Sequence, residues 1–365
     1  MALKSVLILT AGFGEGHNAA ARNLAGALRL RNPTARVEVH DIFHEAYGWI
    51  NRLVRDAYLA AINHTPALWK IVFGILDSTS VVGGGIGIFG RAARHLDSLI
   101  RELEPDVIVS TYPGYGHLLD HLGRIGRIHS AKIATVVTDS LSINSAWYRP
   151  HTDCLLVANE ATADVIAAAG VERGKIRVTG FPVPSVFDEP SDRNDSPPWQ
   201  VLYMVNSSHH LAPDIVRAIL GVPNIGLTVT AGRDEKLAGQ IRELSEKNGV
   251  PVSVYGWTQE IPELIRRSHL LISKAGGATV QEALAARTPM IITQIVPGQE
   301  EGNARLLIEG GAGEFAGSAE AISEAIRHTF GETAALWRRR RDATALLAQP
   351  RASERAAECI EGLAE

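Results

Sequence analysis

The stretch SVLILTAGFGEGHNAAARNLAGAL, residues 5–28, decides the fold class. It begins with a short apolar run typical of a buried strand, turns through three glycines, and continues with alanines and leucines at helical spacing. A strand, a glycine-rich turn and a helix in this order are typical of the first unit of a nucleotide-binding α/β sheet. We therefore expect a parallel sheet whose first strand ends at this turn.

Short apolar runs alternate with helical patterns along the rest of the chain, which is the signature of βαβ units. In the first half these runs are residues 36–42, 106–112, 132–139, 154–159 and 175–181. In the second half they are residues 200–205, 226–232, 252–257, 269–276 and 289–294. Because both halves show the alternation independently, we expect two doubly wound α/β domains with a ligand site in the cleft between them.

A segment without either periodicity separates the two halves. Residues 181–200, FPVPSVFDEPSDRNDSPPWQ, are rich in proline, serine and acids, which predicts an interdomain linker. We expect a first domain over residues 1–190 and a second over residues 191–345. Residues 346–365 are expected to form a C-terminal helix, which could cross back to the first domain.

Composition excludes several classes of protein. The 365 residues include 36 Lys and Arg against 40 Asp and Glu, so a formal net charge of -4 offers no general attraction for nucleic acid. The two cysteines, Cys154 and Cys359, lie far apart in the sequence and have no metal-ligand spacing. We therefore expect no disulfide framework and no zinc site, as suits a reducing cytoplasm. We expect no signal peptide, because the apolar run at the start of the sequence is too short for the core of one.

The sequence predicts no membrane-spanning helix, because no run of roughly 18 apolar residues is uninterrupted. Residues 46–78 are nevertheless rich in Trp, Tyr, Leu and Ile and are expected to form one or two helices. Their apolar side chains fit either a core or an exposed surface that meets lipid. The glycine run at residues 81–90 is interpreted as a mobile loop.

The first glycine turn has two interpretations, a close approach of the backbone to a ligand or simply a tight turn. It holds Gly12, Gly14 and Gly16. A dinucleotide-binding motif GxGxxG would need its third glycine at His17 or at Ala19, which weakens an NAD-binding interpretation. Asp41, after the second strand, is the acid that such a cofactor would need, but an acid is also common in turns.

His17 stands where this turn enters its helix. The positive end of the helix dipole lowers the pKa of a histidine there and favours the neutral, proton-accepting form. A general base is one hypothesis. The alternative is a histidine that packs in the turn as a hydrogen-bond donor.

The second half contains SKAGGATVQEA, residues 273–283, at the end of a predicted strand. Backbone amides of Gly276, Gly277 and Ala278 at the start of the following helix would bind an anion, and Lys274 would add a positive charge. A diphosphate fits such a site.

Acidic and amide side chains complete this region. Thr279 and Glu282 have the spacing of a capping box, so Glu282 either caps its helix or accepts ribose hydroxyls. The segment PGQEEGN, residues 297–303, places Gln299, Glu300 and Asn303 after the next strand, where they could bind a sugar or form a plain surface turn.

At these motifs the sequence resembles the glycosyltransferases that make glycosyldiacylglycerols, namely the monogalactosyldiacylglycerol synthases and the processive diacylglycerol glucosyltransferases. The lipid-linked N-acetylglucosaminyltransferase of peptidoglycan synthesis is a more distant relative. The resemblance covers nearly the whole chain. Its strongest elements are GFGEGHNAAA, VVTDS, VTGFPVPSVF, AGRDEKL, YGW, SKAGGATVQEA and PGQEEGN.

The resemblance implies a GT-B fold, with an acceptor domain followed by a donor domain, and transfer from a UDP-sugar to a lipid with inversion and without a metal or other cofactor. It implies that His17 lies near the acceptor hydroxyl or the donor diphosphate, where we expect it to be the catalytic base, and that Asp139 and Trp147 lie near the acceptor. The residues implied in donor binding are Gly14, Gly16, Arg233, Gly256, Trp257, Lys274, Gly276, Gly277, Ala278, Thr279, Glu282, Gln299, Glu300 and Asn303. A lipid acceptor further implies peripheral contact with the inner face of the cell membrane.

Two departures from the family pattern are visible. The first strand of the second domain is followed by Asn206, Ser207, Ser208, His209 and His210 in place of a glycine-rich loop, and Asn144 stands where the family has a histidine before Trp147. Two alternatives to the transferase therefore stay open. One is an enzyme like a UDP-N-acetylglucosamine 2-epimerase, and the other is a UDP-sugar-binding protein with impaired catalysis.

Overall fold

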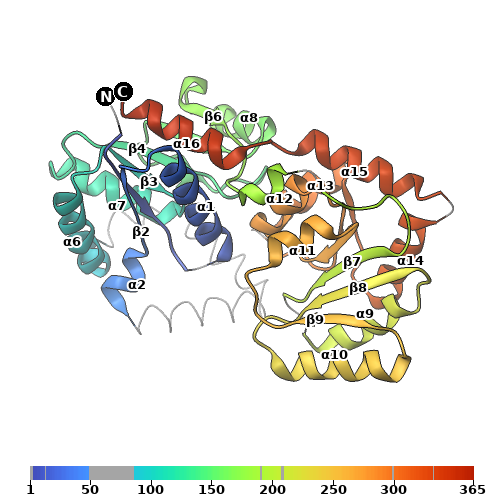
Figure 1. Ribbon diagram of the computed structural model, residues 1–365. Coiled ribbons are helices and arrows are strands. Elements are labelled where there is room, and N and C mark those ends of the chain that lie inside the picture. The colour runs from blue at the N-terminus through green and yellow to red at the C-terminus, as the bar shows by residue number, and fades with distance from the viewer. Residues whose placement is uncertain are drawn as a thin grey trace. The chain divides into compact units, whose positions relative to one another are not determined.

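The computed structural model describes residues 3–12, 14–48, 86–189, 191–206, 209–297, 300–331 and 333–365 (Figure 1). The chain divides into two compact units. The first comprises Met1–Val183, Pro297–Gly302 and Gln349–Glu365, and the second comprises Pro184–Val296 and Asn303–Ala348. Each unit contains a parallel six-stranded sheet with helices around it, which confirms the α/β class.

The first unit is built on a sheet in the order β2-β1-β3-β4-β5-β6, with all neighbours parallel. Its strands are β1 (Ser5–Leu9), β2 (Arg36–His40), β3 (Val107–Ser110), β4 (Lys132–Val136), β5 (Cys154–Val157) and β6 (Ile176–Val178). All five residues of β1 are buried, as expected for a strand covered on both faces. The chain leaves β1 toward β2 and returns to the other side of β1 as β3, so a topological switch point lies between β1 and β3.

Helices cover this sheet and supply the core of the first unit. They are α1 (Glu15–Arg31), α2 (Ile42–Tyr47), α6 (Ile86–Leu103), α7 (Pro113–Arg124), α8 (Glu160–Ala168) and α16 (Ala352–Leu363). Leu96 of α6 and Leu119 of α7 are fully buried in one cluster with Leu7 of β1.

Two predictions for the region before α6 have different outcomes. The prediction of a loop over residues 81–90 is wrong for its second part, because Ile86–Gly90 already belong to α6. The apolar stretch predicted over residues 46–78 begins with the last two residues of α2. Residues 49–78 lie outside the described residues.

The second unit repeats the architecture with the order β12-β11-β10-β7-β8-β9. Its strands are β7 (Trp199–Met204), β8 (Ile225–Thr230), β9 (Val252–Tyr255), β10 (Leu270–Ser273), β11 (Met290–Ile292) and β12 (Gly313–Phe315). The switch point here lies between β7 and β10. The edge strand β12 was not predicted, because its sequence Gly-Glu-Phe contains a single apolar side chain and so forms no apolar run.

Seven helices are described in the second unit's part of the chain or at its border. They are α9 (Ala212–Leu220), α10 (Glu235–Asn248), α11 (Ile261–Arg267), α12 (Gly277–Ala285), α13 (Glu301–Glu309), α14 (Ala319–Phe330) and α15 (Ala335–Leu347). Ile215 and Ile219 of α9 and Ile322 and Ile326 of α14 pack with β7 and β8 in one core.

The segment predicted as a linker is anchored to the second unit instead. Arg193 donates to Thr288 Oγ1 at 2.7 Å and to the carbonyl oxygens of Ser268 and Ala286. Burial lowers the pKa of the Arg193 guanidinium to about 10. The first continuous segment of the first unit ends at Val183, whereas the sequence placed the end of its first domain at residue 190.

The last helix, α16, packs beside α1 in the first unit (Figure 1). Arg31 of α1 lies 2.8 Å from Glu361, 3.1 Å from Glu358 and 3.4 Å from Glu354. Ser353 donates to the carbonyl oxygen of Val183 at 2.6 Å. These bonds attach the end of the chain to the unit that contains its beginning.

The cysteines, which are remote in the sequence, are neighbours in the structure. The Sγ atoms of Cys154 at the start of β5 and Cys359 on α16 lie 3.5 Å apart, and both thiols are free. The separation of the two cysteines in the sequence therefore does not reflect their distance in the structure.

No helix of the described ranges is long and apolar enough to cross a membrane.

Candidate active site

His17 lies in the first turn of α1, at the carboxyl ends of β1 and β3. Its Nδ1 is 2.8 Å from the carbonyl oxygen of Thr111 and 3.0 Å from Thr138 Oγ1. A carbonyl oxygen can only accept a hydrogen bond, so Nδ1 carries the ring hydrogen. The other nitrogen, Nε2, is then the one with a free lone pair.

Aromatic side chains surround the imidazole. The ring centroid of Tyr112 lies 5.1 Å away in an edge arrangement, and that of Trp147 lies 6.0 Å away. Burial lowers the pKa of His17 to about 4, against a smaller raising effect of the Thr111 carbonyl. His17 is therefore neutral at pH 7, and it is a hydrogen-bond donor through Nδ1 and a potential proton acceptor through Nε2 at the same time.

Asp139 and Trp147, the residues implied in acceptor binding, form a pair. The indole Nε1 of Trp147 donates to Asp139 Oδ2 at 2.7 Å. Burial raises the pKa of Asp139 to about 6, and the indole bond partly offsets this. Trp147 is only 2% exposed, and its ring packs near that of His17. Asn144 caps the short 3₁₀ helix that carries Trp147, because its side chain accepts from Ala146 N at 2.8 Å.

The glycine turn is held by Asp41. One carboxylate oxygen of Asp41 accepts from Gly12 N and the other from His44 N, each at 2.9 Å. Asp41 therefore binds the turn and caps α2, which is the turn role that the sequence left open for this acid. Gly14, the residue before α1, has an extended backbone with φ 179°, and a Cβ there would meet only His17 Cδ2 at 3.8 Å. No described neighbour therefore crowds the position of Gly14, and Gly16 follows it in the first turn of α1.

The second unit presents the start of α12 just beyond the carboxyl end of β10, with Lys274, Ala275 and Gly276 between the two elements. The amide of Gly276 already donates to the Lys274 carbonyl oxygen at 2.9 Å. The first three helical amides have no carbonyl partner within a helix, and in α12 they belong to Gly277, Ala278 and Thr279. The anion-binding role expected for Gly276, Gly277 and Ala278 stays a prediction, and the start of α12 adds Thr279 to the amides without an intrahelical partner.

The capping-box interpretation of Thr279 and Glu282 is wrong. The residue that precedes α12 is Gly276, and none of the described side chains caps this helix. Thr279 is the third residue of the helix itself. The half-buried Glu282 lies on the same helix as the free amides, and the ribose interpretation of Glu282 stays a prediction.

Two amide side chains border the Lys274 loop. Asn206, which follows β7, donates from Nδ2 to Ser273 Oγ at 2.6 Å and so bridges the second switch point. Asn303 of α13 donates from Nδ2 to the carbonyl oxygen of Ala275 at 3.2 Å. Asn303 is only 2% exposed, and its Oδ1 has no hydrogen-bond partner among the described residues.

Glu300 and Asn303 do not form part of a plain surface turn. Glu300 and Asn303 are both buried, and Gln299 lies outside the described residues. A Cβ at Gly302 would lie 1.9 Å from the carbonyl oxygen of Ser140, so glycine is required by close packing at that position.

Two further predicted donor residues meet at the ends of β8 and β9. The guanidinium of Arg233 lies over the ring of Trp257 at 5.8 Å from its centroid. Trp257 is 62% exposed and follows Gly256. Nearby in the sequence, His209 Nδ1 lies 2.9 Å from Asp234 Oδ2, while Ser207 and Ser208 lie outside the described residues.

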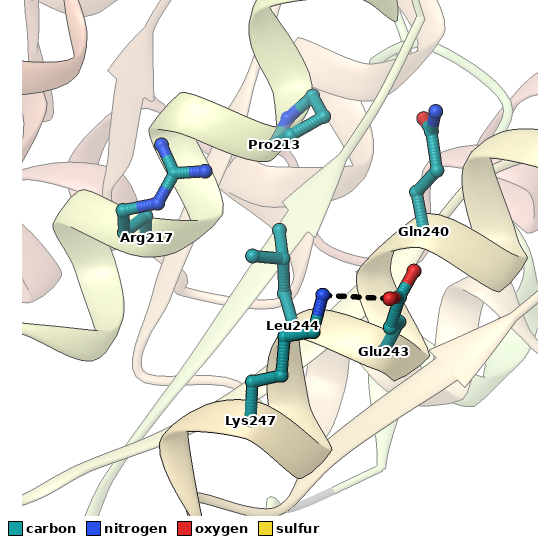
Figure 2. Close-up of a pocket in the computed structure, with 6 residues that line it drawn as sticks. All are labelled: Pro213, Arg217, Gln240, Glu243, Leu244 and Lys247. Carbon is teal, nitrogen blue, oxygen red and sulfur yellow. Dashed lines mark ion pairs between the residues drawn. The ribbon is translucent and has the colours of Figure 1, made fainter.

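A hollow of about 210 Å³ lies between α9 and α10, and the residues that line it are drawn in Figure 2. Its lining residues are Pro213, Arg217, Gln240, Glu243, Leu244 and Lys247. Lys247 and Glu243 pair across one helical turn at 2.7 Å. None of the predicted site residues lines this hollow, so it is distinct from the candidate site.

Sequence reasoning missed Thr111, Tyr112 and Thr138, which contact His17. Thr111 and Tyr112 directly follow β3 and Thr138 lies just after β4, so each is at the carboxyl end of a strand. That position was the available signal, because ligands of doubly wound sheets bind at these ends.

Comparisons with protein families match the first and second halves of the chain to two different family models. Residues 17–183 match the model of the monogalactosyldiacylglycerol (MGDG) synthase family. Residues 212–351 match the model of the glycosyltransferase family 28 C-terminal domain.

Individual proteins extend the match. Monogalactosyldiacylglycerol synthase of Spinacia oleracea is 30% identical over 358 residues, which cover 91% of this chain and 67% of that protein. Processive diacylglycerol beta-glucosyltransferase of Bacillus cytotoxicus is 27% identical over 82% of this chain and 78% of that protein. The crystal structure of MurG from Acinetobacter baumannii has a TM-score of 0.63 at 15% identity, covering 98% of this chain and 99% of the other.

The two parallel sheets, with the structural likeness to MurG, define a glycosyltransferase of the GT-B fold. The chain belongs to the family of monogalactosyldiacylglycerol synthase. These matches do not favour the epimerase-like alternative.

Proposed function

We propose that this protein transfers a hexose from a UDP-sugar to the hydroxyl group of diacylglycerol, with inversion at the anomeric carbon and with His17 as the general base. The observation that carries the proposal is the bond from His17 Nδ1 to the Thr111 carbonyl oxygen at 2.8 Å. It assigns the hydrogen to Nδ1 and leaves Nε2 able to take a proton. The names of the relatives from spinach and Bacillus support diacylglycerol as the acceptor.

The acceptor half of the reaction takes place around His17. The acceptor hydroxyl gives its proton to Nε2 while its oxygen attacks the anomeric carbon from the face opposite the diphosphate. The new C–O bond forms as the bond to the diphosphate breaks, and UDP leaves with the bonding electrons. The imidazolium that results is stabilised at Nδ1–H by the Thr111 carbonyl oxygen, since a hydrogen bond from a charged donor is stronger.

The donor half of the reaction uses the second unit. The amides of Gly277, Ala278 and Thr279 and the charge of Lys274 suit a diphosphate, whose negative charge increases as the sugar leaves. Glu282 suits the ribose hydroxyls. Asn303 is the strongest candidate for a sugar contact, because its buried Oδ1 lacks a partner among the described residues.

A lipid acceptor requires the protein to reach a bilayer. We place the protein at the inner face of the cell membrane as a peripheral protein, on the ground that diacylglycerol does not leave the membrane readily. Residues 46–78 are the segment whose composition best suits this contact.

The test is an assay of the purified protein with a panel of radiolabelled UDP-sugars and diacylglycerol in mixed micelles. With donor and acceptor saturating, His17→Ala is expected to lower kcat roughly a hundredfold or more, as the loss of a general base does. The matched control is His129→Ala, because His129 is an exposed histidine outside the site.

Three results would oppose the proposal. Near-normal turnover by His17→Ala would remove the base assignment. A 2-epimer formed from UDP-N-acetylglucosamine without acceptor, seen by NMR, would support the epimerase-like alternative. UDP binding in calorimetry without sugar transfer to any lipid would indicate a binding protein.

A further inference from the structure

The geometry points to Thr138 as a positioning residue that holds the imidazole of His17 in its productive orientation. This inference rests on the proposed function, in which Nε2 of His17 takes the acceptor proton. Thr138 lies two residues beyond the end of β4 and is 5% exposed. Its hydroxyl oxygen is the second oxygen beside Nδ1, at 3.0 Å.

One ring hydrogen is shared between two acceptors. The Thr111 carbonyl lies at 2.8 Å from Nδ1 and Thr138 Oγ1 at 3.0 Å, and the two residues belong to neighbouring strand ends. A single acceptor would let the ring pivot about the N–H direction. The two acceptors follow different strands, and together with Nδ1 they define a plane. They therefore limit the rotation of the imidazole ring and determine where Nε2 points.

The backbone of His17 is held by the same neighbour. Thr111 Oγ1 donates to the carbonyl oxygen of His17 at 3.1 Å, so Thr111 accepts from the ring and donates to the main chain of one residue. The residue after Thr138, Asp139, binds Trp147, whose ring lies 6.0 Å from the imidazole. The end of β4 therefore restrains His17 directly through Thr138 and indirectly through Trp147.

The chemistry gives Thr138 its effect on the rate. When Nε2 takes a proton, the imidazole becomes a cation. The hydrogen bonds from Nδ1–H to the two oxygens that face it then become stronger. The substrates do not contact Thr138 in this account. Removing its hydroxyl should therefore lower kcat and leave KM for donor and acceptor unchanged.

The experiment compares Thr138→Val with Thr138→Ser in the full chain. The valine keeps the branched shape without the hydroxyl, and kcat should fall about fivefold to tenfold, the effect of losing one ordinary hydrogen bond in the transition state. The serine keeps the hydroxyl and should restore most of the rate. The control is Thr135→Val on β4, because the Thr135 hydroxyl bonds only to Thr152 Oγ1, at 3.4 Å, among its described partners.

A second measurement needs no turnover. In protein labelled with ¹⁵N-histidine, the Nδ1–H of His17 should exchange slowly with water in the natural protein and in Thr138→Ser, and faster in Thr138→Val. Wild-type kcat together with slow exchange in Thr138→Val would overturn the inference, even if His17→Ala is inactive. Turnover by His17→Ala would instead refute the proposed base, and the exchange rates would still decide whether Thr138 holds the ring.

If the valine variant does not fold, Thr138→Ala takes its place in both measurements, because it removes the hydroxyl and adds no bulk. A loss of kcat that Thr138→Ser does not rescue would also count against the inference, since it would assign the effect to packing.

Discussion

At the scale of single residues, the groups that contact Nδ1 of His17 are neutral. Its nearest oxygens belong to a carbonyl and a hydroxyl, and burial keeps the pKa at about 4. A negatively charged neighbour would raise that pKa and make the ring a cation before the acceptor arrives. The observed arrangement keeps Nε2 unprotonated at neutral pH.

This depressed pKa predicts a dependence of stability on pH. Between pH 6.5 and about 4 the unfolded chain protonates His17 and the folded protein does not, so the free energy of unfolding falls as the pH falls. In His17→Gln this contribution is absent. The stability advantage of the natural protein over His17→Gln should shrink by about 2 to 3 kcal/mol across this window. Urea unfolding at a series of pH values measures it.

The control for this series is His129→Gln, which replaces an exposed histidine outside the site. Asp139 acts in the opposite direction, because its pKa is raised from 3.8 to about 6 and its contribution is lost as the pH rises through that range. The Asp139 contribution cancels when the two proteins are compared at equal pH. A constant difference between the natural protein and His17→Gln would contradict the depressed pKa.

At the scale of elements, local sequence patterns predicted most strands correctly but did not predict how α12 starts. The apolar runs predicted the strands of both sheets except β12. The Thr279 and Glu282 pair satisfied the capping-box pattern, yet the residue that precedes α12 is Gly276, three positions before Thr279. The backbone amide of Gly276 bonds to Lys274, and this turn starts the helix without a side-chain cap among the described residues.

Asp41 joins two elements and gives a test at this scale. Asp41→Ala removes the cap of α2 and the bond to Gly12, and the free energy of unfolding should fall by about 1 to 2 kcal/mol. Asp41→Asn keeps a capping oxygen for His44 N and should recover part of that loss. Equal stability of Asp41→Ala and the natural protein, measured by urea unfolding, would show that these two bonds contribute nothing.

At the scale of the whole molecule, the chain ends on the unit where it begins. The α16 helix packs on α1 and on the loop after β6, where Gly180 has φ +91°. A Cβ at Gly180 would lie 2.6 Å from Ala352 Cβ and 2.7 Å from Gln349 Cβ. The contact leaves no room for a side chain between this loop and α16.

Gly180→Ala should therefore lower the free energy of unfolding more than Gly170→Ala. Gly170 has a similar φ of +99°, and a Cβ there would have nothing within 4 Å, so it reports the backbone cost alone, roughly 1 kcal/mol. Gly180→Ala should cost about 1 to 3 kcal/mol beyond this, from crowding against α16. Thermal unfolding measures both, and equal losses would mean that α16 moves aside without cost.

The sequence by itself determined the α/β class, the doubling of the architecture and most of the candidate residues, because strand and helix periodicities and glycine turns are local patterns. The domain boundaries and site roles that it suggested stay predictions, as does a cleft between the domains. The polar segment before β7 looked like a free linker because the partners of Arg193 are remote in the sequence.

Only the tertiary structure decided what surrounds His17. Thr111 and Thr138 lie 94 and 121 residues along the chain from His17, and Cys154 lies 205 residues from Cys359. Such contacts depend on the order of strands in the sheet. The return of the chain from β2 to the far side of β1 places the ends of β3 and β4 near the glycine turn, and no local pattern encodes that return. The histidine could be singled out from the sequence, and the two oxygens that define its free nitrogen could not.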